Sequence, residues 1–203
     1  MDVIYFPIND SQKVLKVRWD KAKLLILTGP AGCGKTAGAL GQALMDMKGK
    51  RVAKLFLARP TISVDEQLGF MPGSMEEKLG VWAGAFKDCL GDLTYASLED
   101  FDTELVAVGM LRGRTIKNAI LIVDEAQNLT FNQLKCIVTR MGKNAKIILC
   151  GDPRQSDITS RTNPLEEISK KLMHLEGCCC IQFPKSDQVR EPFVNLVLEA
   201  LGE

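Results

Sequence analysis

The chain has 203 residues, a length that fits one globular domain with its own core. Its residues are 46% hydrophobic and 25% charged, which are ordinary values for a globular protein. The formal net charge of +1 excludes a strong global attraction to DNA or RNA, so any nucleic-acid contact must come from a local patch.

Apolar, strand-like runs alternate with helix-like segments along the chain. Strands are expected at residues 23–28, 51–58, 103–108, 119–123, 146–150 and 178–183. Helices are expected at 35–48 and 75–90, after the capping-box pair Thr130 and Gln133, and from Pro192 onward. The run at 119–123 is continuously apolar, which is typical of a parallel strand covered on both faces. The alternation predicts an α/β fold with a mostly parallel sheet, helices on both faces, and ligands at the carboxyl ends of the strands.

The cysteines indicate a reducing compartment. There are seven, an odd number, in apolar strand-like settings, so we expect reduced thiols and a cytoplasmic location. Three of them are adjacent, at 178–180, and cannot all point to one side of a strand. No CxxC spacing accompanies them, so a metal site is not expected there.

No apolar run reaches about 18 residues, so no membrane span is expected. The acidic, mixed N-terminus does not resemble a signal peptide.

The segment from Gly29 to Thr36 matches the phosphate-binding pattern G-x-x-x-x-G-K-[ST], the Walker A motif, in full. It follows an expected strand and opens an expected helix, which is the context that the pattern requires. Glycines let backbone N–H groups surround phosphates, and the helix N-terminus adds positive potential. We expect Lys35 to reach the β- and γ-phosphates and the Thr36 hydroxyl to bind Mg²⁺. The motif predicts a P-loop NTPase that uses ATP.

Two acids and a glutamine follow the later buried strands. Asp124 and Glu125 end the strand at 119–123, where Asp124 can hold Mg²⁺ through water, as a Walker B aspartate does. Glu125 can polarise the attacking water as general base, which favours hydrolysis over simple binding. Gln155 follows the strand at 146–150 and can report on the γ-phosphate from the same edge of the sheet. Each of these segments also fits a plain solvated turn.

Three blocks, GPAGCGKT, RGRTIKNAILIVDEAQN and GDPRQSD, in this order and at these distances, resemble those of the PhoH family. These proteins are phosphate-starvation-inducible ATPases related to the core of superfamily 1 helicases. Weaker blocks extend the resemblance over nearly the whole chain, at 58–60, 67–73, 187–190 and Pro192. The resemblance implies one RecA-like P-loop NTPase domain over residues 1–203. Some family members also carry a PIN nuclease domain or RNA-binding extensions, and we expect neither here, because the P-loop begins at residue 29.

The resemblance also implies roles for single residues. The nucleotide is expected to contact the loop residues Gly29, Pro30, Ala31, Gly32, Cys33, Gly34, Lys35, Thr36 and Ala37. Gln12 falls where the helicase-like core places an adenine-reading glutamine, and an exposed surface glutamine is the alternative. Gln155 matches a γ-phosphate sensor and Arg190 an arginine that contacts the γ-phosphate in related helicases. Arg59 corresponds to a block that contacts single-stranded nucleic acid.

The resemblance to helicases raises the question of what closes over the nucleotide. Helicases close two lobes on ATP, and this chain is long enough for one. We therefore expect a homo-oligomeric ring, with a hexamer as the expected state, in which a neighbour supplies an arginine to the bound ATP. Arg112 and Arg114 are the candidates, and both also fit nucleic-acid contacts or plain surface residues. Binding of single-stranded RNA or DNA is expected to be weak and salt-sensitive.

Three other functions fit the sequence less well. Type II thymidine kinases resemble this chain in the P-loop and in the Asp-Glu-Ala-Gln block, but the paired CxxC motifs that hold their zinc are absent from the sequence. A nucleotide switch without catalysis would not need Lys35, Asp124 and Glu125 together. A nuclease would need a cluster of acids at metal-ligand spacing, and the sequence has none beyond the ATP site.

Overall fold

The computed structural model describes residues 5–60, 84, 86–89, 100–158 and 162–189, together with the single positions 193, 194, 197 and 200. Six parallel strands within these residues form one sheet in the order β3-β2-β4-β5-β1-β6. The strands are β1 (Leu24–Thr28), β2 (Lys54–Arg59), β3 (Thr103–Ala107), β4 (Ala119–Val123), β5 (Ala145–Gly151) and β6 (Cys178–Gln182). The predicted α/β fold, a RecA-like parallel sheet, is confirmed.

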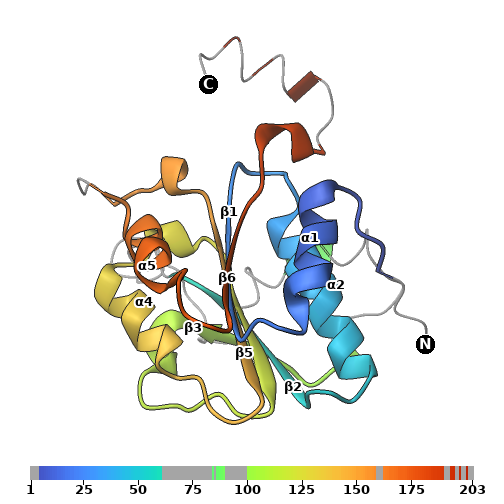
Figure 1. Cartoon of the computed structure of the whole chain (residues 1–203), viewed down its shortest axis with the longest axis vertical. Coiled ribbons are helices and arrows are strands. Elements are labelled where there is room, and N and C mark those ends of the chain that lie inside the picture. Colours follow the sequence, from blue (N-terminus) through green and yellow to red (C-terminus); the bar gives the residue numbers. More distant parts are fainter. Residues whose placement is uncertain are drawn as a thin grey trace, which may run out of the picture.

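Helices cover both faces of the sheet (Figure 1). On one face lie α1 (Asp10–Trp19) and α2 (Lys35–Lys48), and on the other lie α4 (Phe131–Val138) and α5 (Pro164–Leu172). Short 3-10 turns follow several strands, namely η3 (Val108–Leu111), η4 (Ala126–Asn128), η5 (Pro153–Gln155) and η6 (Lys185–Asp187). Parallel strands need long crossover connections, and α2, α4 and α5 lie in the β1–β2, β4–β5 and β5–β6 connections.

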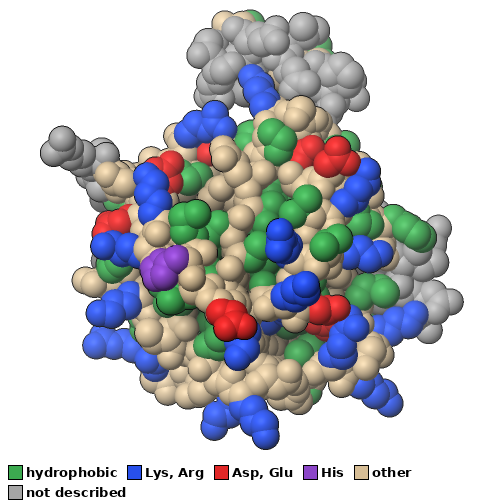
Figure 2. Space-filling view, viewed as in Figure 1, with side chains coloured by type: hydrophobic (Ala, Val, Ile, Leu, Met, Phe, Trp, Pro, Cys, Tyr) green, Lys and Arg blue, Asp and Glu red, His purple; other side chains and the backbone are tan. Residues whose placement is uncertain are grey.

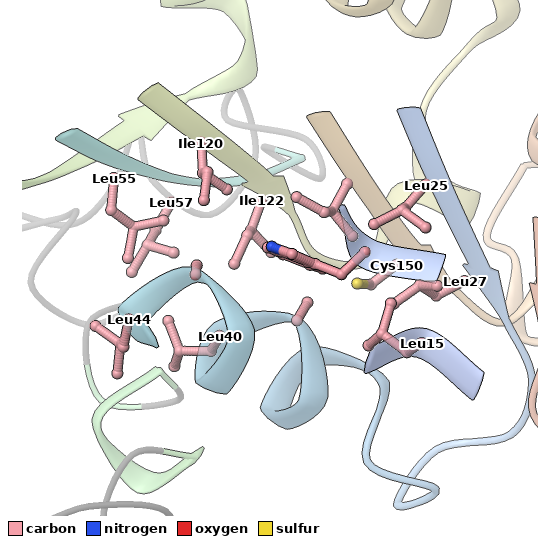
Figure 3. Packing of buried hydrophobic residues seen from close by; sticks show 14 of the residues in the cluster. Leu15, Leu25, Leu27, Leu40, Leu44, Leu55, Leu57, Ile120, Ile122 and Cys150 are labelled. Atoms are coloured by element: carbon pink, nitrogen blue, oxygen red, sulfur yellow. The ribbon is translucent and has the colours of Figure 1, made fainter. Parts of the chain in front are cut away.

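Each face of the sheet packs on its helices through a separate apolar cluster. On the α1–α2 side, Leu40 of α2 packs with Ile120 and Ile122 of β4 (Figure 3). The alternate β4 residues Leu121 and Val123 belong to the cluster on the α4–α5 side. All five β4 residues are therefore buried, as its continuous apolar sequence predicts. Full burial of one such side chain contributes roughly 1.5–3 kcal/mol.

The expected strands all occur, with small shifts at their ends. The residues of β4 are those predicted. The start of β2 lies further along the chain than the expected Arg51, because the backbone N–H of Arg51 donates to Asp46 O in the turn that closes α2, at 2.9 Å. The helix after the phosphate motif is confirmed as α2, and the capping box of Thr130 and Gln133 is confirmed at the start of α4.

Two helices are absent from the sequence-based prediction. Helix α1 begins after its N-cap Asn9, and only part of it is buried, including Leu15 and Trp19. Its outer positions mix polar and apolar side chains, so the sequence has no clear helical period. Helix α5 is capped by Asn163 and begins at Pro164. The helices predicted at 75–90 and from residue 192 onward lie largely outside the described residues.

The cysteines alternate across β6 as expected. Cys178 and Cys180 pack on the α4–α5 side and Cys179 on the α1–α2 side. None of the seven cysteines, which all lie within the described ranges, forms a disulfide. Within the described ranges, no group of three or more side chains is arranged to hold a metal ion, and no helix is long and apolar enough to cross a membrane.

Candidate nucleotide site

The candidate site lies where the carboxyl ends of β1, β5 and β4 meet. Strand β5 pairs with β1 on one side and with β4 on the other, both in parallel. The loop at 29–34, the acids Asp124 and Glu125, and turn η5 with Gln155 each follow one of these strands, so they share one edge of the sheet. Parallel α/β sheets bind ligands at this edge.

Every backbone carbonyl of the loop at 29–34 accepts a hydrogen bond. Lys35 Nζ donates to the carbonyls of Gly29 and Pro30, at 2.7 and 2.8 Å. Residues near both ends of the chain reach the remaining carbonyls: Gln188 Nε2 donates to Ala31 O at 2.9 Å, Val189 N to Gly32 O at 3.0 Å, Asn9 Nδ2 to Cys33 O at 2.9 Å, and Gln12 Nε2 to Gly34 O at 2.8 Å. The loop is therefore held on its carbonyl side.

The other side of the loop presents backbone N–H groups. Among the described residues, no backbone carbonyl accepts a hydrogen bond from the N–H groups of residues 31–36. Gly32 and Gly34 have φ angles of 77° and 79°, a region that glycine enters without the steric cost of a Cβ atom. Lys35 begins helix α2, whose N-terminus adds positive potential. Open donors beside a helix N-terminus form a binding environment for phosphate groups.

Gly29 fixes the point at which the loop leaves the sheet. Its φ is 141°, and a Cβ atom there would lie 2.3 Å from Phe183 O. Gly29 N donates to Gly151 O at 3.2 Å, and Phe183 N donates to Thr28 O at 2.7 Å. The end of β1 is thereby joined to β5 on one side and to the residue after β6 on the other.

Lys35 is buried and lies against its own loop, where its ammonium group occupies the carbonyls of Gly29 and Pro30. The Cys33 thiol donates to the same Pro30 carbonyl at 2.8 Å. Burial raises the pKa of the Cys33 thiol, so it stays protonated at neutral pH and remains a donor. Lys35 must turn away from these carbonyls before it can reach a phosphate group.

Two oxygen ligands suited to a divalent cation lie side by side. Thr36 Oγ1 donates to Asp124 Oδ1 at 2.7 Å, and Asp124 is buried at the tip of β4. Hydroxyl and carboxylate oxygens are ligands that Mg²⁺ prefers, so these residues fit the predicted metal position. Asp124 Oδ2 accepts from Nε and Nη2 of Arg59, at 3.1 and 2.7 Å. Arg59 thus lies inside this site, and its contact with nucleic acid stays a prediction.

The backbone turns sharply at Glu125, directly after the metal-ligand candidate Asp124. Glu125 has a φ of 55°, in the left-handed region that costs a non-glycine residue roughly 1–2 kcal/mol. Its half-exposed carboxylate accepts a hydrogen bond from Gln127 Nε2 at 2.7 Å, and Asn128 N donates to Glu125 O at 3.0 Å. Strained residues at functional sites persist when their surroundings hold them, as they do here.

Gln127 is a site residue that the sequence analysis did not single out. It is buried, and its Oε1 accepts from Asp152 N at 3.1 Å. Its backbone carbonyl accepts from Ser156 Oγ at 3.0 Å and from Asn163 Nδ2 at 3.1 Å. Gln127 therefore links Glu125 to the turn that carries Gln155, whose own side chain is exposed.

Gln12 is fully buried, so its alternative interpretation as an exposed surface residue is wrong. Its Oε1 accepts from Ile8 N at 2.9 Å while its Nε2 holds the Gly34 carbonyl. Gln12 lies beside the phosphate loop, and its reading of adenine stays a prediction. Asn9 and Gln188, which hold two other loop carbonyls, were not predicted from the sequence.

The three remaining candidate arginines differ in their surroundings. Arg114 forms two hydrogen bonds with Glu104, at 2.6 and 3.1 Å, and these hold the pKa of that carboxyl down to about 2. The guanidinium of Arg114 also lies 5.0 Å from the centre of the Phe56 ring. Arg112 is exposed, and no ion pair joins it to a described residue. Arg190 lies outside the described residues.

The fold and the loop at 29–34 together define a P-loop nucleotide-binding domain. Residues 6–202 match the family described as "PhoH-like protein", so the chain belongs to the PhoH family. The resemblance seen in the sequence is thereby confirmed.

Curated relatives of the same family share about a third of their residues with this chain. The "PhoH-like protein" of Bacillus subtilis (strain 168) is 34% identical over 178 residues, which cover 85% of this chain and 56% of the relative. "Protein PhoH" of Escherichia coli (strain K12) is 32% identical over 200 residues, which cover 95% of this chain and 56% of the relative. The chain therefore spans only about half the length of these relatives.

Solved structures of low sequence identity resemble this chain more distantly. The "Sulfolobus solfataricus SWI2/SNF2 ATPase core domain" has a TM-score of 0.47 at 15% identity, covering 87% of this chain and 37% of that one. The "Crystal structure of Bacteroides Pif1 bound to ssDNA" has a TM-score of 0.42 at 16% identity, covering 99% of this chain and 46% of that one.

Replacing Gln127 by Leu should lower the free energy of unfolding by roughly 1–3 kcal/mol, because the buried Asp152 N–H loses its acceptor. Urea denaturation followed by circular dichroism measures this loss. The matched control is Gln155→Leu, an exposed glutamine in the adjoining turn, which should change stability by less than about 0.5 kcal/mol. Equal losses in the two variants would contradict the linking role of Gln127.

Proposed function

We propose that the chain is a Mg²⁺-dependent ATP hydrolase of helicase-like type, and that residues 1–203 act as one domain. One observation carries the proposal. The open N–H groups of the loop lie at the same edge of the sheet as Lys35, Thr36, Asp124 and Glu125. The loop and Lys35 serve binding, whereas the two acids serve the metal and the attacking water. The odd number of cysteines, in apolar strand-like settings, supports a reducing, cytoplasmic location.

Each residue at the loop has a defined task in the proposed reaction. Thr36 Oγ1 directly, and Asp124 through water, would hold Mg²⁺. When bound, Mg²⁺ neutralises charge on the phosphate oxygens and orients them for transfer. Lys35 exchanges the carbonyls of Gly29 and Pro30 for phosphate oxygens. The loop N–H groups hold the phosphate chain in place, so that most of the catalysis is positioning and charge stabilisation.

Glu125 takes the role of general base in this proposal. It accepts a proton from the water that attacks the γ-phosphorus, while the Gln127 amide holds its Oε2 atom. Gln155, on the neighbouring turn, is proposed to sense the γ-phosphate, and Arg190 to contact it. Gln12 is proposed to read the adenine from its position beside the loop.

The substitution Glu125→Gln should lower ATP hydrolysis by roughly 10²–10⁴-fold, the usual contribution of a general base. Nucleotide affinity should stay near the wild-type value, because the glutamine keeps the size and the Gln127 contact of the original side chain. Steady-state phosphate release and the binding of a fluorescent ATP analogue measure the two quantities. Lys35→Ala is the companion variant and should lose affinity as well. Undiminished hydrolysis by the glutamine variant would assign the base to another residue.

A homo-oligomeric ring, with six subunits as the expected state, is proposed to complete the site. An arginine from a neighbour is typically worth about 10³–10⁵ in rate, so an isolated subunit should be a poor ATPase. Arg112 is favoured over Arg114 for this task, because Arg112 is exposed while Arg114 is held by Glu104.

Mixing two inactive variants tests this arginine. Arg112→Ala keeps Glu125, and Glu125→Gln keeps Arg112, so a mixed ring contains some sites with both groups. We expect an equal mixture to regain roughly a quarter of the wild-type ATPase rate, because transfer in trans needs one intact group from each neighbour. Analytical ultracentrifugation of the same samples reports the assembly. A monomer with full activity would contradict the ring.

Single-stranded RNA or DNA is the proposed partner of the assembled protein. On the face shown in Figure 2, Lys and Arg side chains are interspersed with Asp and Glu, and no large patch of one sign is visible. The net charge is +1, and Arg59 is already paired with Asp124. Binding should therefore be weak and indifferent to base sequence.

Short single strands should raise the ATPase rate at low salt and should lose this effect as salt increases. For two or three phosphate contacts, affinity should fall by roughly tenfold between about 50 and 200 mM salt. Rates measured with poly-U RNA, with oligo-dT DNA and without nucleic acid decide the point. Identical rates in all three samples at low salt would count against a nucleic-acid partner.

A further inference from the structure

Arg59 occupies a position at the metal site that its predicted role does not explain. It is the last residue of β2, and β2 pairs in parallel with β4, so that Ala58 lies opposite Val123. This register brings the Arg59 guanidinium to Asp124, where both Nε and Nη2 donate to the single oxygen Oδ2. Arg59 Nη2 also lies 3.6 Å from Glu125 Oε1.

The ion pair compensates a carboxylate that has little access to water. The Asp124 side chain is 13% exposed and that of Arg59 is 25% exposed. A largely buried carboxylate without a partner is strongly destabilising, and Glu125 adds a second negative charge next to it. The guanidinium also packs against a buried ring, with its Cζ atom 5.8 Å from the centre of Phe86. Arg59 thus supplies the positive charge that balances the acids in the nucleotide-free protein.

The same hydrogen bonds limit how Asp124 can serve a metal. A carboxylate has about four acceptor positions. The Thr36 hydroxyl takes one on Oδ1, and Arg59 takes two on Oδ2. Water bound to Mg²⁺ needs acceptor positions on this carboxylate, and a divalent cation repels a guanidinium at such short range. The metal and Arg59 therefore compete for Asp124.

We propose that Arg59 is an internal counter-ion of Asp124 which Mg²⁺ displaces when it binds together with the nucleotide. Arg59 is then a positioning residue: it keeps Asp124 in place before the metal arrives, and it raises the metal concentration needed to fill the site. The inference rests on the proposed function, because it assumes that the loop binds a nucleotide with its metal.

The test compares metal binding in the wild type, Arg59→Gln and Arg59→Lys. Each protein is saturated with fluorescent mant-ADP, and Mg²⁺ is added until the signal is constant. Arg59→Gln should lower the half-saturating Mg²⁺ concentration by about tenfold, since the competing charge is gone. Its melting temperature without ligand should fall below that of the wild type, because Asp124 loses its partner. Adding Mg²⁺ with ADP should then raise the melting temperature of the variant by more than it raises that of the wild type.

The matched control is Arg51→Gln, which breaks the ion pair with Asp46 in α2. This variant should also melt earlier, but its half-saturating Mg²⁺ concentration should equal that of the wild type. If Arg59→Gln does not fold, Arg59→Lys decides. A lysine keeps the positive charge but loses the paired donors that hold Asp124 Oδ2, so the half-saturating Mg²⁺ concentration of this variant should still lie below that of the wild type.

An unchanged or higher half-saturating concentration in the Arg59 variants would overturn the inference while leaving nucleotide binding intact. A wild type that binds no mant-ADP would overturn the proposed function as well, so the two failures are distinguishable.

Discussion

The placement of hydrogen bonds around the loop at 29–34 is the constraint on which the rest of the structure depends. A short, glycine-rich loop can present its N–H groups in one direction only if its carbonyls find donors in the other. Here every carbonyl from Gly29 to Gly34 has a donor, and the donors come from α2, from α1 and its N-cap Asn9, from the Cys33 thiol, and from the segment after β6. The sheet order then brings the Walker B acids to the open side.

This arrangement makes the two ends of the described chain part of the site. Asn9 Nδ2 donates to Cys33 O at 2.9 Å and to Asp187 O at 3.3 Å, so one side chain joins three segments that are far apart in sequence. Any ligand that binds the loop must therefore also stabilise α1 and the residues after β6. Unfolding of either segment would release loop carbonyls and weaken the anion site, which couples nucleotide affinity to the stability of the whole domain.

Local patterns predicted the elements and residues whose role is set by neighbours in sequence. The loop at 29–34, β4 and Asp124 belong to this group, because a motif or an apolar run specifies them directly. The roles of Gln127, Asn9 and Gln188 depend on partners up to 178 residues away, which a single sequence does not reveal. Helix α1 was missed because its apolar side is narrow. Contact of Arg59 with nucleic acid stays a prediction, and its ion pair with Asp124 depends on the β2–β4 register, which neighbours in sequence do not reveal.

The resting position of Lys35 has a consequence for which nucleotides the site can retain. In the ligand-free loop the ammonium group donates to two carbonyls. When it leaves, Gly29 O loses this donor and Pro30 O keeps only the Cys33 thiol, which has a free-energy cost. A ligand recovers this cost only if it offers the ammonium group anionic oxygens at the β- or γ-position. A nucleoside monophosphate cannot do so, and it would leave the lysine on its own backbone. Under the proposed function, the loop is expected to discriminate nucleotides by the length of the phosphate chain, independently of any contact with the base.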